Sequence, residues 1–232
     1  VETERGGRFA ARFLITGVGC LSTANIPKIP GLEEFQGDWY HTGQWPHEGV
    51  DFAGKRVGQI GTGSTGIQAA PVIAAEAGHL TVFQRTANYS VPAQNKPLTP
   101  EFKARVRDNW AEIRAVMHST LNGHPFTIED RSVHDVSDAE LKAMLERAWQ
   151  VGGLQFRANF RDVLTDETAN AKLAEFVKDK IRSIVRDPAT AERLADIDHP
   201  YAAKRPPIDS FYFEAFNRDN VALVDVREDP IQ

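Results

Sequence analysis

Residues 57–66 read VGQIGTGSTG, a short apolar run that passes directly into glycines at the spacing Gly-x-Gly-x-x-Gly. The run predicts a buried strand, and the alanine-rich stretch 67–77 that follows predicts a helix packed on a sheet. A second apolar and β-branched run at 80–83 predicts the next strand. A strand, a glycine turn, a helix and a strand in a unit of this length are typical of a site for the pyrophosphate of a dinucleotide.

Each glycine of the loop has a separate task in that pattern. Gly61 permits the tight turn, Gly63 lets the backbone approach a pyrophosphate, and Gly66 lets the helix pack closely on the strand. The N-terminus of the helix then presents free N–H groups and partial positive charge to the phosphates.

The end of the second strand indicates which dinucleotide fits. An Asp or Glu there would accept hydrogen bonds from a ribose 2′-hydroxyl. The sequence continues instead with Gln84, Arg85 and Thr86, and a guanidinium beside a hydroxyl suits a 2′-phosphate. We therefore expect NADPH rather than NADH. The alternative is a glycine-rich turn followed by a solvated arginine.

Outside this unit the chain alternates between strand-like and helical patterns. Residues 13–16 predict a buried strand that ends in a glycine turn, and residues 221–226 predict a strand in the same sheet as 57–60. Residues 100–195 carry no strand-like run. The arrangement with the fewest parts is an α/β domain with an all-helical insertion.

Three apolar stripes in the insertion predict helices. The first stripe places four residues on one face of a single helix: Phe102, Val106, Trp110 and Ile113. The second covers 141–148 and follows Ser-Asp-Ala-Glu at 137–140, which is a capping-box pattern. The third covers 173–185 and is broken at Asp187-Pro188.

The composition is that of a globular protein. The 232 residues are 41% hydrophobic and 25% charged, with a net charge of −5, which excludes wholesale disorder and gives no support for a nucleic-acid partner. The single cysteine, Cys20, excludes an internal disulfide framework and a cysteine-built zinc site, and we expect no metal. No apolar run is long enough to span a membrane and residues 1–12 lack a signal-peptide core, so we expect a cytoplasmic protein. Because the chain begins with Val1 rather than Met, we also expect a piece of a longer reading frame.

A second motif precedes the glycine loop, where residues 35–46 read FQGDWYHTGQWP. It places Phe35, Gly37, His41 and Trp45 at a fixed spacing whose chance expectation is on the order of 10⁻⁴ from average residue usage. From the residues alone, this is a packed linker. Phe35 and Trp45 would anchor it, and His41 would bond a backbone group.

This stretch resembles the fingerprint FxGxxxHxxxW, followed by Pro or Asp, of the Baeyer–Villiger flavin monooxygenases. The resemblance covers essentially the whole chain and points to the cyclohexanone and cyclopentanone monooxygenase branch. Further stretches that carry it are 54–57, 61–68, 81–86, 89–92, 204–206 and 216–221. The chain resembles the middle portion of the family's sequence, since no glycine-rich FAD loop precedes residue 13.

The resemblance implies an enzyme that binds FAD and NADPH and takes a ketone and O2 as substrates. Such enzymes insert an oxygen atom next to the carbonyl through an FAD C4a-peroxide, so a cyclic ketone becomes a lactone or a ketone becomes an ester. Arg205 would be the active-site arginine, and His41 would couple linker geometry to domain motion. Residues that would wrap the pyrophosphate or hold the 2′-phosphate are Gly61, Thr62, Gly63, Ser64, Thr65, Gly66, Ile67, Gln68, Arg85, Thr86 and Lys204. Without the resemblance, Lys204 and Arg205 would be a solvated pair before two prolines.

The resemblance also implies a division of the chain. Residues 1–34 would be the end of an FAD-binding segment and a linker, 35–99 and 201–232 the two parts of a Rossmann-like NADPH-binding domain, and 100–200 its helical insertion. Most of the FAD site would lie in segments of the same enzyme outside this sequence. Two other functions stay open: a stand-alone NADPH-binding module without catalysis, and a related flavin monooxygenase that oxygenates nitrogen or sulfur.

Overall fold

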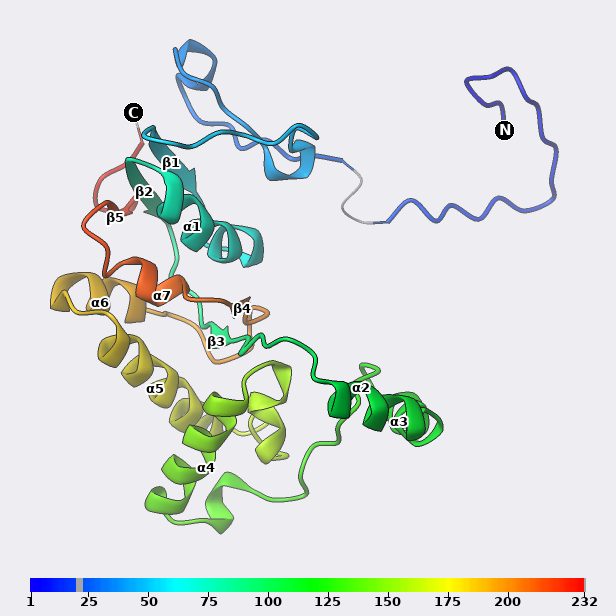
Figure 1. Cartoon of the computed structure of the whole chain (residues 1–232), viewed down its shortest axis with the longest axis vertical. Helices are drawn as coiled ribbons and strands as arrows, with labels where there is room; N and C mark the ends of the chain where they lie inside the picture. The colour runs from blue at the N-terminus through cyan, green and yellow to red at the C-terminus, as the bar shows by residue number, and fades with distance from the viewer. Residues whose placement is uncertain (20–22, 232) are drawn as a thin grey trace. The chain divides into compact units, whose positions relative to one another are not determined.

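The computed structural model describes residues 1–19 and 23–231 (Figure 1). These residues divide into two units. One unit contains residues 1–50 and the other residues 51–231. The buried apolar side chains of the described residues all lie in the larger unit, between Ile67 and Phe216. Cys20 lies outside the described residues, so the expectations that rest on it stay predictions.

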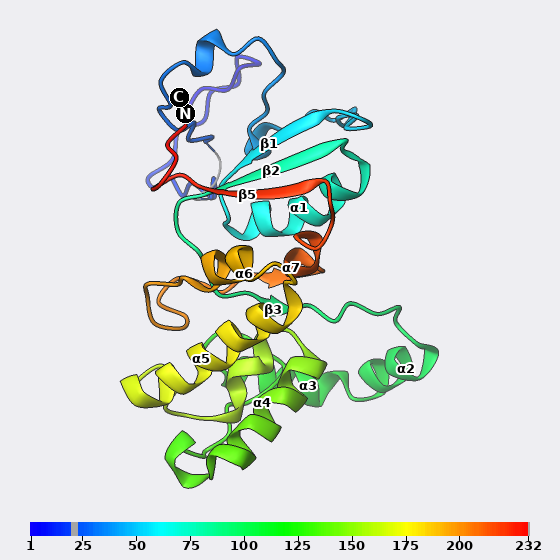
Figure 2. The ribbon, with the colours of Figure 1, turned by 90° about the vertical axis from the view of Figure 1, so that its left-hand side faces the viewer.

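A three-stranded parallel sheet forms one end of the larger unit (Figure 2). Its strands are β1 Arg56–Ile60, β2 His79–Gln84 and β5 Val221–Asp225. Strand β2 lies in the middle and pairs in parallel with β1 on one side and β5 on the other. The prediction that the strand near residue 221 joins the sheet of the strand near residue 57 is therefore confirmed.

Helix α1, Ser64–Glu76, connects β1 to β2 and covers one face of this sheet (Figure 2). Alternate residues of β2 are buried, among them Leu80 and Val82, which are fully covered. Helix α1 supplies small buried side chains at Ala70 and Ala74, so its backbone approaches the strands closely.

The stretch 100–195 is helical and contains no strand, as predicted. Its two longest helices are α4 Asp138–Val151 and α5 Glu167–Ile184. The shorter helix α6, Pro188–Ala195, follows α5, and 3₁₀ turns lie at Val133–Asp135 and Leu154–Asn159. The predicted capping box is confirmed, because Glu140 N donates to Ser137 Oγ and Ser137 N donates to the Glu140 carboxylate. Asp187 caps α6 at the predicted break.

A second, two-stranded sheet joins these parts. Strands β3 Val91–Pro92 and β4 Ile208–Asp209 pair in parallel, and the short helix α7, Tyr212–Ala215, follows β4. Both views place this small sheet between the three-stranded sheet and helices α4 and α5 (Figures 1 and 2).

The single helix predicted over residues 102–113 is wrong. Two helices form instead, α2 Pro100–Asp108 and α3 Trp110–Ser119, separated at Asn109. The Asn109 backbone leaves the helical region and its side-chain amide donates to the Arg105 carbonyl at 2.8 Å. An asparagine that bonds the backbone locally competes with helix continuation.

The buried strand predicted at residues 13–16 is also wrong. In the unit 1–50 these residues are irregular, and Phe13 and Ile15 are 78% and 92% exposed. Regular elements in the described part of this unit are 3₁₀ turns at Leu32–Glu34 and Thr42–Gln44. A strand needs a neighbour for its N–H and C=O groups, and the described part of the unit pairs no strand with residues 13–16.

Candidate functional site

The glycine loop between β1 and α1 meets three different steric demands. Gly61 has φ +102°, a region that side chains rarely adopt. A Cβ on Gly66 would overlap the carbonyl oxygen of Gly61, so the helix could not start this close to the strand. A Cβ on Gly63 would meet no atom within 4 Å, and Gly63 is exposed. The loop thus has a turn that glycine adopts readily and other residues rarely do, a close contact and an open approach for a ligand.

The first turn of α1 is open to an anion. Gly63 is its N-cap residue and supplies no side-chain hydrogen bond. The amides of the first turn of a helix have no partner within the helix and carry the positive end of its dipole. In this 13-residue helix those amides belong to residues 64–66, beside the open space at Gly63.

The loop is joined to the end of β2 by two hydrogen bonds. Gly61 N donates to the Phe83 carbonyl at 3.0 Å, and Thr62 Oγ1 donates to the Thr86 carbonyl at 3.0 Å. Thr62 is buried, so its hydroxyl faces the protein. The structure therefore brings together the loop and the predicted pair Arg85 and Thr86.

The other predicted residues of this site differ in how far their side chains are exposed to a ligand. Ile67 is 1% exposed and packs in the core, so it presents no side chain to a ligand. Thr65 and Gln68 are exposed on α1, and Ser64 is half-buried.

Three predicted cations, Arg85, Lys204 and Arg205, are exposed. Among the described residues, none of the three has a hydrogen bond or an ion pair. Because β3 and β4 run parallel, the segments that enter them, 85–90 and 203–207, lie at the same end of the small sheet. Val91 N donates to the Pro207 carbonyl at 3.1 Å at that end.

The fingerprint residues lie in the unit 1–50, whereas the glycine loop lies in the unit 51–231. His41 Nδ1 accepts from Gly43 N at 3.0 Å, which confirms the predicted bond to a backbone group. The predicted anchors are not buried in the described part of this unit: Phe35 is 60% exposed and Trp45 is 41% exposed, although the Trp45 ring packs against Tyr40 with 5.9 Å between ring centroids. The described part of this unit buries no apolar side chain into which they could pack. A Cβ on Gly37 would lie 2.7 Å from the exposed Phe35 ring, which would have to turn away to make room for it.

A buried polar pair beside the cations was not predicted as part of the site. Ser90 is 0% exposed and Asp209 is 5% exposed, and Ser90 Oγ lies 2.5 Å from Asp209 Oδ2. Burial raises the pKa of the Asp209 carboxyl, while hydrogen bonds from Ser90 and the backbone of Tyr212 act in the opposite direction. No local sequence pattern marks such a pair, because its partners are 119 residues apart.

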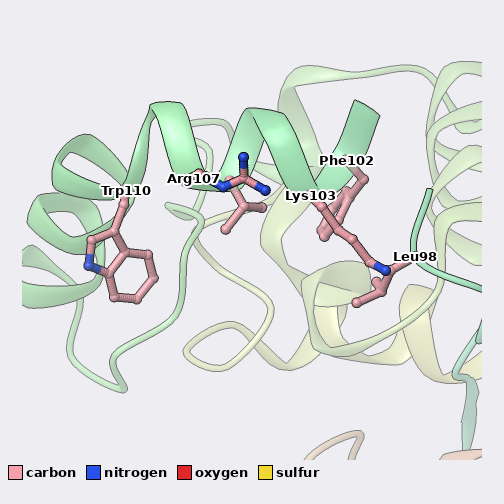
Figure 3. A pocket seen from close by; sticks show the side chains of 6 residues that line it. Leu98, Phe102, Lys103, Arg107 and Trp110 are labelled. Atoms are coloured by element: carbon pink, nitrogen blue, oxygen red, sulfur yellow. The ribbon is translucent and has the colours of Figure 1, made fainter. Parts of the chain in front are cut away.

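Two open grooves lie away from the glycine loop. One, of about 420 Å³, runs along α2 and is lined by Leu98, Phe102, Lys103, Val106, Arg107 and Trp110 (Figure 3). The other, of about 550 Å³, lies on α4 and α5. Neither is lined by a predicted site residue.

The described residues contain no group of three His, Cys, Asp or Glu side chains placed to hold a metal ion. In the same part of the chain, no helix combines the length and the apolar character that a membrane crossing requires.

A scan for protein families found no family model that matches the chain. Curated relatives do match. The chain is 47% identical over 237 residues to cyclohexanone 1,2-monooxygenase of Acinetobacter sp, covering 100% of this chain and 42% of that protein. It is 42% identical to cyclopentanone 1,2-monooxygenase of Comamonas sp. (strain NCIMB 9872), covering 95% and 41%. It is also 40% identical to phenazine N-monooxygenase PhzNO1 of Lysobacter antibioticus, covering 100% and 43%.

The comparison with solved structures also finds monooxygenases. The fold matches an oxidized steroid monooxygenase bound to NADP with a TM-score of 0.93 and 49% identity, over 99% of this chain and 44% of that one. It matches OTEMO in complex with FAD and NADP with a TM-score of 0.91 and 43% identity, over 95% and 43%. The chain thus spans less than half the length of these proteins. By sequence and by fold, it belongs with the Baeyer–Villiger monooxygenases of the cyclohexanone and cyclopentanone type.

Proposed function

We propose that this chain is the NADPH-binding part of an FAD-dependent Baeyer–Villiger monooxygenase, which inserts an oxygen atom next to a ketone carbonyl. Cyclic ketones would give lactones and open-chain ketones would give esters. The observation that carries the proposal is the glycine loop, held by hydrogen bonds beside a β2 end that bears Arg85 instead of an acid. The ketone-oxygenating relatives support the reaction class.

The binding of NADPH divides between two groups of residues. The amides of residues 64–66 would bind the pyrophosphate, with Gly63 leaving room for its approach. Arg85, Thr86 and Lys204 would hold the 2′-phosphate, since a guanidinium can donate two parallel hydrogen bonds and an ammonium adds a point charge. The fit is supported by the uncapped helix start and by cations without a carboxylate partner in the described part of the chain.

Arg205 would act on the oxygenation step. Its charge is permanent at any accessible pH, so it can stabilise the negative charge that develops on oxygen while a ketone is converted. Pro206 and Pro207 restrict the backbone directly after Arg205. The role requires an exposed guanidinium near the nicotinamide of bound NADPH, and Arg205, in the segment before β4, is exposed.

Bound FAD would carry electrons from NADPH to O2. We propose that most of its site lies in segments of the complete enzyme outside this sequence, with residues 1–34 as the end of an FAD-binding segment. Residues 35–99 and 201–232 would then form a Rossmann-like NADPH domain, with 100–200 as its helical insertion. The solved relative that holds both FAD and NADP supports a site for each cofactor in the complete enzyme.

A second candidate function is oxygenation of a ring nitrogen. It is favoured by the phenazine N-monooxygenase, which matches the full length of this chain at 40% identity. The two functions differ in product, since a ketone gains an ester oxygen whereas a heteroaromatic ring gains an N-oxide. Offering both substrate classes to the complete enzyme separates them.

The proposal is tested by equilibrium titration of the purified chain with NADPH and with NADH, followed through the fluorescence of the reduced nicotinamide. We expect tighter binding of NADPH. Equal binding of the two, or no binding of either, would contradict the proposal for this chain. A yellow preparation with a flavin spectrum would show in addition that the chain holds FAD.

A further inference from the structure

The small sheet between β3 and β4 contains a polar pair in a fully enclosed place. Ser90 Oγ lies 2.5 Å from Asp209 Oδ2 and 3.3 Å from the Pro207 carbonyl oxygen. The second carboxyl oxygen, Asp209 Oδ1, accepts from Tyr212 N at 3.1 Å. Backbone bonds from Val91 N to Pro207 O and from Ala93 N to Asp209 O flank the pair.

The pair is costly to bury and has no counter-charge. Within the described residues, no cation forms an ion pair with Asp209, and an unpaired carboxylate is expensive to remove from water. Hydrogen bonds satisfy the group in either protonation state. When Asp209 is ionised, the Ser90 hydroxyl donates to it. When Asp209 is neutral, it donates to Ser90 Oγ and the Ser90 hydroxyl donates to the Pro207 carbonyl. Apolar side chains can often replace buried polar groups without loss of stability, so packing alone does not account for the pair, and its contacts point to a further task.

We infer the task of the pair from the small number of hydrogen bonds that hold the two-stranded sheet together. Each strand has two residues, and proline at position 207 offers no N–H to the ladder. The segment before β4 carries Lys204 and Arg205, and it is tied to β3 chiefly at the Pro207 carbonyl and at Asp209. Because Pro206 and Pro207 each have a fixed φ, few free torsions separate the start of β4 from the two cations.

We propose that Ser90 and Asp209 are positioning residues that hold the Lys204–Arg205 segment against the segment following Arg85, and that this register sets the preference for a 2′-phosphate. The inference rests on the proposed binding of NADPH. In this inference, Ser90 and Asp209 contact neither the cofactor nor the substrate. They act only by keeping the cations of two segments within reach of one phosphate.

The chain supplies a matched control for the test. Ser132 is also buried, at 7% exposure, and its Oγ lies 2.5 Å from the carboxylate of Asp162. This second hydroxyl–carboxylate pair lies in the helical part, away from β3 and β4. Ser90→Ala and Ser132→Ala each remove a hydroxyl–carboxylate bond, and Ser132→Ala also removes the bond that Ser132 Oγ accepts from His134 N. Asp209→Asn is the conservative variant, because its amide can donate to Ser90 Oγ while its oxygen still accepts from Tyr212 N.

The experiment titrates NADPH and NADH into the 232-residue chain and its three variants. For Ser90→Ala we expect the ratio of NADPH to NADH affinity to fall about fivefold, the scale of one buried hydrogen bond. For Ser132→Ala we expect the wild-type ratio despite a similar loss in thermal midpoint, and Asp209→Asn should keep most of the preference. An unchanged ratio in Ser90→Ala, or an equal fall in Ser132→Ala, overturns the inference.

A second readout does not depend on the cofactor. Amide hydrogen exchange without ligand should be faster at Val91 and Ala93, whose amides donate to the Pro207 and Asp209 carbonyls, in Ser90→Ala than in Ser132→Ala. If the wild-type chain shows no preference for NADPH, the proposed function fails and this exchange still decides the positioning role. Equal exchange at Val91 and Ala93 in the two variants overturns it.

Discussion

At the scale of single residues, Thr62 shows how the glycine loop keeps its shape. Its buried hydroxyl donates to the Thr86 carbonyl and so connects the loop to the residues after β2. We expect Thr62→Val to lower the free energy of unfolding by about 1–3 kcal/mol, because it leaves a carbonyl without its partner at an unchanged side-chain volume. Thr62→Ser should retain most of the stability. Urea denaturation measures both, and equal stability of the Val variant and the wild type would refute this role.

Arg205 gives the sharpest prediction on catalysis. In a complete enzyme that carries this segment, Arg205→Ala should lower the rate of ester formation by about 10²–10³, since one preorganised cation is removed from a site of developing negative charge. Flavin reduction by NADPH should remain largely intact. Arg205→Lys should recover little, because an ammonium does not reproduce the guanidinium fork. Stopped-flow absorbance separates the two half-reactions, and near-normal ester formation by the Ala variant would remove Arg205 from the catalytic site.

The residues that could be predicted from the sequence are those whose task is local. Gly61, Gly63 and Gly66 are fixed by one turn and one helix start, so their spacing was sufficient to assign them. Ser90 and Asp209 could not be predicted as a pair, because their contact exists only after β3 and β4 align.

At the scale of elements, the apolar residues of α5 contribute more to the free energy of unfolding than those of α2 and α3. Leu173 in α5 is fully buried, whereas Trp110 at the start of α3 is 52% exposed beside the groove on α2 (Figure 3). We expect Leu173→Ala to cost about 2–5 kcal/mol of unfolding free energy. Trp110→Ser should change it by about 0.5 kcal/mol or less. Chemical denaturation of both variants tests this, and a comparable loss for Trp110→Ser would show that the α2–α3 face is packed.

Capping carboxylates make the helices sensitive to acid. Backbone N–H groups lower the pKa of Asp166 and Asp187 at the starts of α5 and α6. A folded-state pKa below the unfolded value adds stability that is fully present above the unfolded value of about 3.9 and is lost as the pH falls through the lower folded-state pKa. Burial raises the pKa of Asp209 and Glu214, which acts in the opposite direction. The lowered carboxyls outnumber these two: Glu101, Asp138, Glu140, Glu146, Asp162, Asp166, Asp187 and Asp225.

We therefore expect the urea midpoint to stay nearly constant from about pH 7 to pH 5 and to fall below about pH 4. Asp187→Ser keeps a capping oxygen that does not titrate, so its midpoint should fall less steeply with acid than that of the wild type. A midpoint that is constant or rises on acidification would contradict this account.

Two predicted elements were wrong, one because it depends on a distant partner strand and the other because a local side chain interrupts the helix. The run at residues 13–16 has the composition of a strand, but a strand forms only where another strand offers its edge. The stripe through Phe102 and Trp110 has helical spacing, and the break at Asn109 comes from a side chain that the apolar spacing does not register. Helices α4 and α5 were predictable because their caps and stripes agree.

At the scale of the whole molecule, the larger unit 51–231 contains the sheet, the glycine loop and the exposed cations, so it holds the whole of the proposed NADPH site. The fingerprint lies in the other unit. The chain matches about 42% of the length of its cyclohexanone-oxygenating relative, and the oxygenation chemistry is proposed for the complete enzyme rather than for this part of it.

The central claim is that this chain selects NADPH by its 2′-phosphate, and Arg85 tests it most directly. Titration should show tighter binding of NADPH than of NADH by the wild type. Arg85→Ala should lower the NADPH affinity about ten- to hundredfold, the loss of one charge-assisted phosphate contact, and should leave the NADH affinity unchanged. Arg107→Ala, which removes an exposed arginine on α2, should change neither. Equal affinities of the wild type for the two cofactors, or an Arg85→Ala chain that still prefers NADPH as strongly as the wild type, would contradict the claim.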